Sequence, residues 1–385
     1  PWIWTFRIKS PLYEDSFFKK YPELIARRGT YKFEDREPLF LSPAEPKART
    51  LILRMLRTMA IDYKIDGLLL DYIRYDETLG DDLLTKKYFR EYFINKYHQE
   101  PPINIKKDSP FFNEFQLWRE EQVTIMVKAV KRQLTNINPE IKIGAAIFRT
   151  EREGRLLKMQ DWRHWSNNQY INFLCPMLYT DNNKELNEWI NSETDNNTRF
   201  DYIYPSLGAH RFYSADDFYH EVGLLHQRNI PGMNIFSLLH LGVENLPDLA
   251  HGIFRKPAYL PEKSTINSVK LILSDTENWL RKISKLESLS GFGKIKNIIY
   301  KIVQTNSGLH PNNKDQYNVN ELKKEISDIK KYTQSANKNE NIPELLIPEI
   351  IEPLDYILRL IEIDSHKKET KNDYFPSTSP STIKR

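Results

Sequence analysis

A carboxylate at the end of an apolar run is the feature of this sequence best suited to chemistry. The run that starts at Gly67 is followed directly by Asp71, and then by Tyr72, Arg74 and Tyr75. Because successive side chains of a strand point to opposite faces, Asp71 leaves the predicted strand on the same face as the small residue Gly67. Such an acid is either a catalyst or a structural group paired with a cation such as Arg74. Tyr72, Arg74 and Tyr75 are candidate substrate-binding residues beside it.

Catalysis by carboxylates needs a second acid, because one group must protonate a leaving oxygen while the other attacks or activates water. Asp181 comes just after the run PMLYT, and Glu151 follows a predicted strand that ends at Phe148. We prefer Asp181, and then Glu151, as the partner of Asp71. Loops also carry many charged residues that serve only solubility. Each of these acids is therefore as well explained by a solvated loop side chain as by a catalytic role. Three further loop acids share this ambiguity: Asp76, Glu77 and Glu153.

Aromatic and imidazole side chains form a third group of candidates. Trp4 lies in the first predicted strand, Tyr179 lies just before Asp181, and His210 follows the turn YPSLG. Aromatic rings stack on flat ligand faces such as sugars, although most of them pack in cores. Trp4, Tyr179 and His210 complete the predicted substrate-binding set. No spacing of His, Cys, Asp and Glu predicts a metal site, and we expect no metal or other cofactor.

The composition argues against several classes of protein. The chain has 385 residues, enough for one large domain with an extension, and its 56 Lys and Arg nearly balance 52 Asp and Glu. A net charge of +4 argues against a dedicated nucleic-acid binder. The single cysteine, Cys175, lies in an apolar segment where it cannot form an intramolecular disulfide. No apolar run is long enough to span a membrane.

Short β-like runs alternate with amphipathic helical patterns over residues 1–260, which is typical of βα units and a parallel sheet. Helices are expected from Pro46, from a cap at Asn113 and from near Ser214. The sheet could close into a barrel or stay open and doubly wound. We prefer the barrel because no strand is followed by a glycine-rich phosphate loop. The predicted strands are 2–8, 67–72, 141–148, 171–179, 202–206 and 233–238.

The composition changes after residue 260. Helical patterns recur without strands, with apolar stripes in 266–280, 322–329 and 354–361, so residues 261–364 are expected to form a helical extension. Residues 365–385 are polar and carry too few apolar side chains to offset the entropy lost on ordering. We expect this tail to be disordered.

Taken together, the motifs along residues 1–256 resemble the glycosyl hydrolase-like family 10 domain, particularly its bacterial and cyanobacterial members. The matching pieces occur in family order, which makes the resemblance specific. They are WIWTFRI, LSPAEPKAR, KIDGLLLDYIRY, FQLWREEQVTIMVKAV, QDWRHW, INFLCPMLYTDN, YPSLG and GMNIFSLLHLG.

The resemblance implies a TIM-type (β/α) barrel in which the strand at residues 2–8 is the third. The first two strands are then missing, and the chain is either an active enzyme or an inactive fragment. The implied activity is hydrolysis of a polysaccharide through Asp71 and a second acid. The alternative is a non-catalytic carbohydrate-binding or scaffolding protein whose C-terminal helices contact a protein partner. The sequence fixes no compartment, and an exported or cell-envelope location stays open.

Overall fold

The structure is a computed structural model of the chain, and it carries side chains. It describes residues 1–8, 20–26, 39–75, 82–103, 105–194, 202–211, 215–227, 230, 232–242, 246–251, 254, 258–285, 292–309, 318–339, 342–344 and 346–374. These residues form two compact units. The first contains Pro1–Glu193 and Ile203–Gly208, and the second contains Thr194–Tyr202 and Ala209–Arg385.

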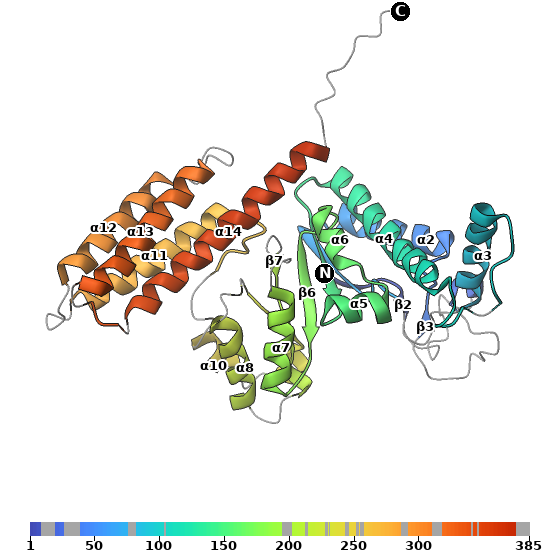
Figure 1. The fold of residues 1–385 in the computed structure, drawn as a ribbon, viewed down its shortest axis with the longest axis horizontal. Coiled ribbons are helices and arrows are strands. Elements are labelled where there is room, and N and C mark those ends of the chain that lie inside the picture. The colour runs from blue at the N-terminus through green and yellow to red at the C-terminus, as the bar shows by residue number, and fades with distance from the viewer. Residues whose placement is uncertain are drawn as a thin grey trace, which may run out of the picture. The chain divides into compact units, whose positions relative to one another are not determined.

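The first unit is built on a parallel sheet whose strands follow one another in the order β1-β4-β5-β6-β8, with β7 beside β6. This order never reverses, as it would in a doubly wound sheet, and it is the order of a barrel wall. With helices between its strands, the sheet is a half-barrel (Figure 1). The strands are β1 (Trp2–Trp4), β4 (Gly67–Asp71), β5 (Lys142–Ile147), β6 (Phe173–Leu178), β7 (Tyr202–Ile203) and β8 (Ser206–Gly208).

The first predicted strand is divided in the structure. β1 ends at Trp4, the chain bends, and Arg7–Ile8 forms β2, which pairs antiparallel with β3 (Leu39–Phe40). Because of this bend, Phe6 is fully buried in the core whereas Trp4 stays exposed. An unbroken strand over residues 2–8 would place Trp4 and Phe6 on the same face. That prediction is wrong.

Helices bury the outer face of the sheet. Alternate strand residues such as Leu70 and Ile143 pack in one core with Leu56 of α2 and Val127 of α4. The predicted cap of α4 is wrong, since the helix begins one residue before Asn113 and Phe111 precedes it without a side-chain cap. The helices of this unit are α2 (Pro46–Asp62), α3 (Leu83–Tyr97), α4 (Phe112–Ile137), α5 (Glu151–Lys158), α6 (Trp162–Asn167) and α7 (Asn183–Thr194), with the 3-10 turn η1 (Pro22–Leu24).

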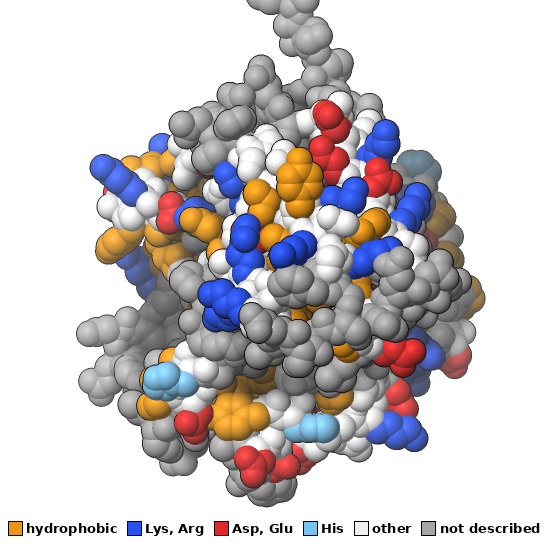
Figure 2. Space-filling model, turned by 90° about the vertical axis from the view of Figure 1, so that its left-hand side faces the viewer, with side chains coloured by type: hydrophobic (Ala, Val, Ile, Leu, Met, Phe, Trp, Pro, Cys, Tyr) orange, Lys and Arg blue, Asp and Glu red, His pale blue; other side chains and the backbone are white. Residues whose placement is uncertain are grey.

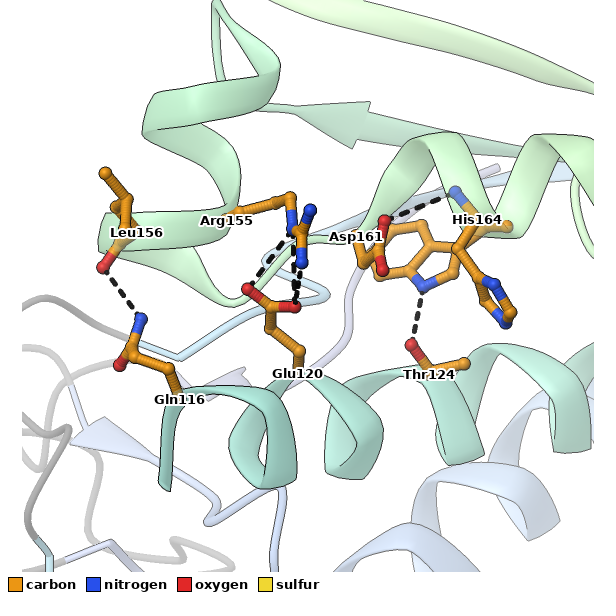
Figure 3. Close-up of polar contacts among 8 residues, drawn as sticks. Gln116, Glu120, Thr124, Arg155, Leu156, Asp161 and His164 are labelled. Atoms are coloured by element: carbon orange, nitrogen blue, oxygen red, sulfur yellow. Dashed lines mark hydrogen bonds and ion pairs between the residues drawn. The ribbon is translucent and has the colours of Figure 1, made fainter. Parts of the chain in front are cut away.

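Polar contacts fix α5 and α6 to the side of α4 (Figure 3). The Arg155 guanidinium donates to the Glu120 carboxylate, with 3.0 Å between Nη2 and Oε2. Further along α4, the indole Nε1 of Trp165 donates to Thr124 Oγ1 at 2.9 Å. Trp165 is fully buried, so this hydrogen bond satisfies a polar atom that would otherwise be costly to bury.

The opposite, inner face of the sheet carries small side chains on β4, β5 and β6. Gly67 and Gly144 leave no room for a larger residue, since an added Cβ would lie 2.6 Å from the Lys142 carbonyl oxygen and 2.2 Å from the Phe173 ring, respectively. Cys175 of β6 is paired in register with Ala146 of β5 and is buried. The inner face is thus packed closely at these positions of the strands.

The second unit contains a helical bundle with its own core. Isoleucines and leucines from α11, α12, α13 and α14 are buried together, among them Leu273, Ile298, Ile326 and Leu354. Helix α12 was not predicted from the sequence, because none of the three apolar stripes lies within its residues. The elements are η2 (Ala209–Arg211), α8 (Ala215–Gln227), β9 (Asn234–Phe236), α9 (Leu238–Leu241), α10 (Leu246–His251), α11 (Thr265–Ile283), α12 (Phe292–Gly308), α13 (Val319–Asn339) and α14 (Leu346–Tyr374).

The last helix extends further than the sequence predicts. α14 continues to Tyr374, so residues 365–374 are helical rather than part of a disordered tail. Residues 375–385 lie outside the described part of the chain. The predicted start of α8 at Ser214 also falls on a residue that is not described.

Candidate active site

Asp71 lies at the carboxyl end of β4, on the inner face of the half-barrel. Register pairing places it beside Trp4, the last residue of β1. Its side chain is only 6% exposed, and its carboxylate accepts two hydrogen bonds, from the indole Nε1 of Trp2 at 2.9 Å and from the Tyr72 backbone N–H at 2.7 Å. The acid is therefore held in one orientation by a side-chain and a backbone donor.

Tyr72 is the centre of an aromatic and cationic cluster next to Asp71. Its ring lies edge-on to that of Trp4, with 5.5 Å between the centroids, and 5.9 Å from that of Phe40. Arg7 donates a hydrogen bond to the Tyr72 hydroxyl, and its guanidinium lies 4.5 Å from the ring centroid. Arg74 contacts the same ring at 4.3 Å. Two cations and one acid thus converge at this end of the sheet.

Arg74 and Tyr179 connect this cluster to β6. The Arg74 side chain is buried, and its Nη1 lies 3.9 Å from the sulfur of Met177. Burial raises the pKa of Tyr179, and the negative charge of Asp71 raises it further, while Arg74 acts in the opposite direction. Tyr179 therefore keeps its proton at neutral pH and can donate a hydrogen bond at this site.

Tyr75 lies in a different environment from Tyr72. Its side chain is 1% exposed, and its hydroxyl accepts a hydrogen bond from Thr85 Oγ1 at 3.2 Å. Thr85 also contacts Asp82, the buried residue that caps α3. Burial, reinforced by the negative charge of Asp82, raises the pKa of Tyr75. Tyr75 therefore connects α3 to the segment after β4 through this buried hydrogen bond, and its side chain is not exposed for contact with a ligand.

The two preferred partners of Asp71 have different surroundings. Glu151 is the first residue of α5 and forms an ion pair with Arg163 of α6, with 2.7 Å between Oε2 and Nε. Asp181 is exposed and begins the segment that leads from β6 to α7. Asp181 thus follows the carboxyl end of β6 and is exposed, whereas Glu151 is engaged at the start of α5.

The remaining predicted residues fall elsewhere. His210 belongs to the second unit, where its ring lies 5.4 Å from that of His240 and 6.0 Å from that of Phe236. Glu153 is paired with Arg149 at 2.7 Å, and both side chains are partly buried. Two other candidate acids, Asp76 and Glu77, lie outside the described residues.

Sequence reasoning missed two residues of the site, Trp2 and Arg7. Trp2 could have been found from its spacing, because residues two apart on a strand share a face, and Trp4 was already a candidate. Arg7 had no such signal. Its contact with Tyr72 depends on the bend between β1 and β2, which the residue pattern does not reveal.

No group of three or more His, Cys, Asp and Glu is arranged to hold a metal ion among the residues that the structure describes. Within the same residues, no helix is both long and apolar enough to cross a membrane.

The parallel sheet, with its strands in sequential order and helices between them, places the first unit in the class of (β/α) half-barrels. The chain belongs to the glycosyl hydrolase-like 10 family, whose model matches residues 1–200. The family was therefore identified correctly from the sequence motifs. No match was found among curated proteins.

Three solved structures show distant likeness to the chain. They are a β-galactosidase from the psychrophilic Marinomonas ef1 (TM-score 0.42, 11% identity) and α-galactosidases from Geobacillus stearothermophilus (0.34, 10%) and Lactobacillus brevis (0.28, 8%). The matches cover 57%, 65% and 60% of this chain but only 41%, 29% and 30% of those proteins. The chain thus spans less than half the length of each, and no assignment of a residue or substrate rests on them.

Proposed function

We propose that the half-barrel hydrolyses glycosidic bonds of a polysaccharide, with Asp71 as one of two catalytic carboxylates. The observation that carries this proposal is the position of Asp71 on the inner face, at the end of β4 where barrel enzymes have their active sites. Beside it are Trp2 and Trp4, whose side chains are 37% and 44% exposed. Exposed indole rings next to a carboxylate suit stacking on a sugar.

The chemistry requires a second carboxylate, for which we propose Asp181. One acid protonates the leaving oxygen, and the other either attacks the anomeric carbon or activates water. In a substrate complex, a separation of about 5 to 5.5 Å between the two carboxyl groups would define a retaining enzyme, and about 6.5 to 9.5 Å an inverting one. Tyr179 and Arg74 are proposed to bind substrate hydroxyls around this pair.

The test is the release of reducing ends from a panel of neutral and acidic polysaccharides by the full chain and by Asp71→Asn. Loss of a catalytic carboxylate lowers turnover by about 10² to 10⁴-fold. Asp66→Asn is the matched control, because Asp66 is exposed just before the other end of the same strand. Unchanged turnover in Asp71→Asn would remove Asp71 from the mechanism.

Comparison of Asp181→Asn with Glu151→Gln then identifies the second acid. We expect Asp181→Asn to lose turnover and Glu151→Gln to keep most of it, because Glu151 is engaged by Arg163. If only the Glu151 variant is inactive, the order of the two candidates is reversed.

A non-catalytic carbohydrate-binding protein is the second candidate function. The observation that favours it is that the Asp71 carboxylate already accepts two hydrogen bonds from the protein, as a structural acid would. In that case the chain and Asp71→Asn would bind the same polysaccharide equally well, and neither would release reducing ends.

A further inference from the structure

Arg7 is a cation of the candidate site to which the proposed hydrolysis gives no role. Backbone hydrogen bonds fix the segment before it, since the Thr5 N–H donates to the Asp71 carbonyl at 2.7 Å and the Phe6 N–H to the Tyr72 carbonyl at 3.2 Å. The backbone N–H of Tyr72 contacts the Asp71 carboxylate, whereas the Tyr72 hydroxyl contacts Arg7. The acid and the cation therefore lie at opposite ends of one tyrosine, a separation similar to the span of one sugar ring.

The hydrogen-bonding capacity of Arg7 is only partly used. Its Nη1 donates to the Tyr72 hydroxyl, whereas its Nε is buried without a hydrogen-bond partner. Among the residues that the structure describes, no carboxylate forms an ion pair with Arg7, and that of Asp71 accepts from Trp2 and from the Tyr72 backbone instead. A buried donor without an acceptor is costly, so an acceptor brought by a ligand would be favoured at this position.

Several other cations of the chain have acidic partners. The ion pairs include Arg155 with Glu120, Arg163 with Glu151, and Lys323 with Glu362. Figure 2 likewise shows one face of the molecule on which Lys and Arg side chains lie among those of Asp and Glu. The guanidinium of Arg7 instead lies 4.9 Å from the ring centroid of Trp4 and 4.5 Å from that of Tyr72. Aromatic rings attract a cation without neutralising its charge, so Arg7 can still pair with an anion.

We propose that Arg7 binds a carboxylate on the sugar held at Asp71, so that the substrate is a polysaccharide containing acidic sugars. The inference rests on the proposed hydrolytic site and names its substrate class. A carboxylate offers two oxygens in one plane, which suits the two N–H groups on the Nε and Nη2 edge of a guanidinium. Because Arg7 is half-buried, an outward shift of its guanidinium brings this edge to the ligand, while the exposed ring of Trp4 stacks on the sugar.

A neutral polysaccharide fits the site less well. Its hydroxyls could accept from Nε, but they bring no charge to a guanidinium without a counter-ion among the described residues. Hydrogen bonds between two ionised groups are stronger than those between neutral ones. The second arginine of the cluster, Arg74, is buried and contacts Met177 of β6, so the carboxylate is assigned to Arg7.

The experiment compares acidic polysaccharides with their own carboxyl-reduced forms, which keep the linkages and lose the charge. Polygalacturonate, alginate, hyaluronan and carboxymethylcellulose are the probes. Binding to the full chain is measured by calorimetry, and release of reducing ends is measured separately. We expect at least one acidic probe to bind and its reduced form to bind about 10 to 100-fold more weakly. This preference should decrease as the salt concentration rises.

Variants of Arg7 test whether it is the residue that reads the carboxylate. Arg7→Met should abolish the preference for the acidic form, whereas Arg57→Met should keep it, because it removes the same charge at an exposed residue of α2. Arg7→Lys keeps the charge but lacks the two-donor edge, so it should recover only part of the preference. If Arg7 served only to hold Tyr72, Arg7→Met would weaken binding of both forms equally, and an unchanged ratio would overturn the proposal.

The remaining outcomes separate this inference from the proposed hydrolysis. Reduced forms that bind at least as tightly as the acidic ones, or a failure of every acidic probe to bind, would also overturn the role of Arg7. Binding that depends on Arg7 without release of reducing ends would support carboxylate recognition and contradict hydrolysis at Asp71. Circular dichroism establishes that each variant is folded.

Discussion

Tyr72 has an unusual backbone conformation directly after the candidate catalytic acid. Its φ angle is 49°, in the left-handed region that residues with a Cβ rarely adopt. Contacts of its ring with Trp4, Arg7 and Arg74 hold it there. The same turn points the Tyr72 backbone N–H at the Asp71 carboxylate. The conformation of one residue therefore both orients the acid and assembles the cluster beside it.

Trp2→Phe should lower the free energy of unfolding by about 1 kcal/mol, because the buried Asp71 carboxylate loses the indole hydrogen bond. Urea denaturation followed by circular dichroism measures the change. Trp4→Phe is the control, since it shortens a neighbouring ring of the same strand without removing a hydrogen bond to Asp71. Equal effects of the two substitutions would show that ring size, and not the hydrogen bond, accounts for the loss.

At the scale of single residues, the sequence predicted which face Asp71 occupies but not which groups touch it. The period of a strand is local, so it follows from a few consecutive residues. The contact between Trp2 and Asp71 joins residues far apart in the chain, and that of Arg7 with Tyr72 requires a bend. Tyr75 shows the opposite error. It was predicted to bind substrate because it is near Asp71 in the sequence, but its side chain is buried and hydrogen-bonded to Thr85.

Close approach of neighbouring strands explains the glycine at the start of β4. Gly67→Ala should destabilise the protein by about 1 to 3 kcal/mol, because the new methyl group would meet the Lys142 carbonyl oxygen, which the β4–β5 pairing fixes. Gly223→Ala is the matched control. Nothing lies within 4 Å of the added Cβ in α8, so this change should stabilise the helix by about 0.5 to 1 kcal/mol. Thermal unfolding would contradict the argument if both variants shifted in the same direction.

The ion pair between α4 and α5 gives a prediction that depends on pH. Arg155→Met should lower the free energy of unfolding by about 1 to 3 kcal/mol at pH 7, because the nearly buried Glu120 loses its partner while Arg155 itself is partly exposed. Burial already raises the pKa of Glu120 above its ordinary 4.5, and loss of the guanidinium raises it further.

The sign of the pH effect follows from the raised pKa of Glu120. The folded state binds this proton more tightly than the unfolded state does, so the corresponding stability is fully present below pH 4.5 and is lost as the pH rises through the folded pKa. The deficit of Arg155→Met should therefore be small in acid and grow toward pH 7 in urea titrations. Glu120→Met with Arg155→Met should recover part of it, and a deficit independent of pH would contradict the explanation.

Elements were predicted from the sequence more reliably than their ends. The apolar stripes of α2 and α4 and the β-rich runs are strong local signals, and the structure has an element at each of them. The start of α4 was misplaced because Phe111 occupies the N-cap position without a capping side chain, whereas Asn113, which has the right chemistry for a cap, lies two residues later, inside the helix. Helix α12 was missed although its isoleucines fill the bundle core.

The chain as a whole combines a family domain with a bundle that lies outside the family match, since the match ends at residue 200. We propose that residues 258–385 fold independently, because α11 to α14 share one buried core. A fragment with these bounds should be helical and unfold cooperatively in urea, as judged by circular dichroism. A non-cooperative transition would show that the bundle requires the rest of the chain.

The fold class was predictable because the succession of strands and helices and the family motifs agreed. The separation into two units was harder to predict from composition, since the division between them falls near residue 209 rather than 260. The change in composition indicates where strands end in the sequence. The limits of a compact unit depend instead on contacts between segments that are distant in the chain.

Cys175 is the one thiol of the chain, and it is buried on β6, between β5 and β8 of the half-barrel sheet. A thiol reagent can reach it only when the sheet opens, so the rate of labelling under native conditions measures the frequency of that opening. The bundle contributes no thiol to the signal. The rate of labelling would therefore report local opening of the half-barrel alone. A ligand bound beside Asp71 should lower this rate.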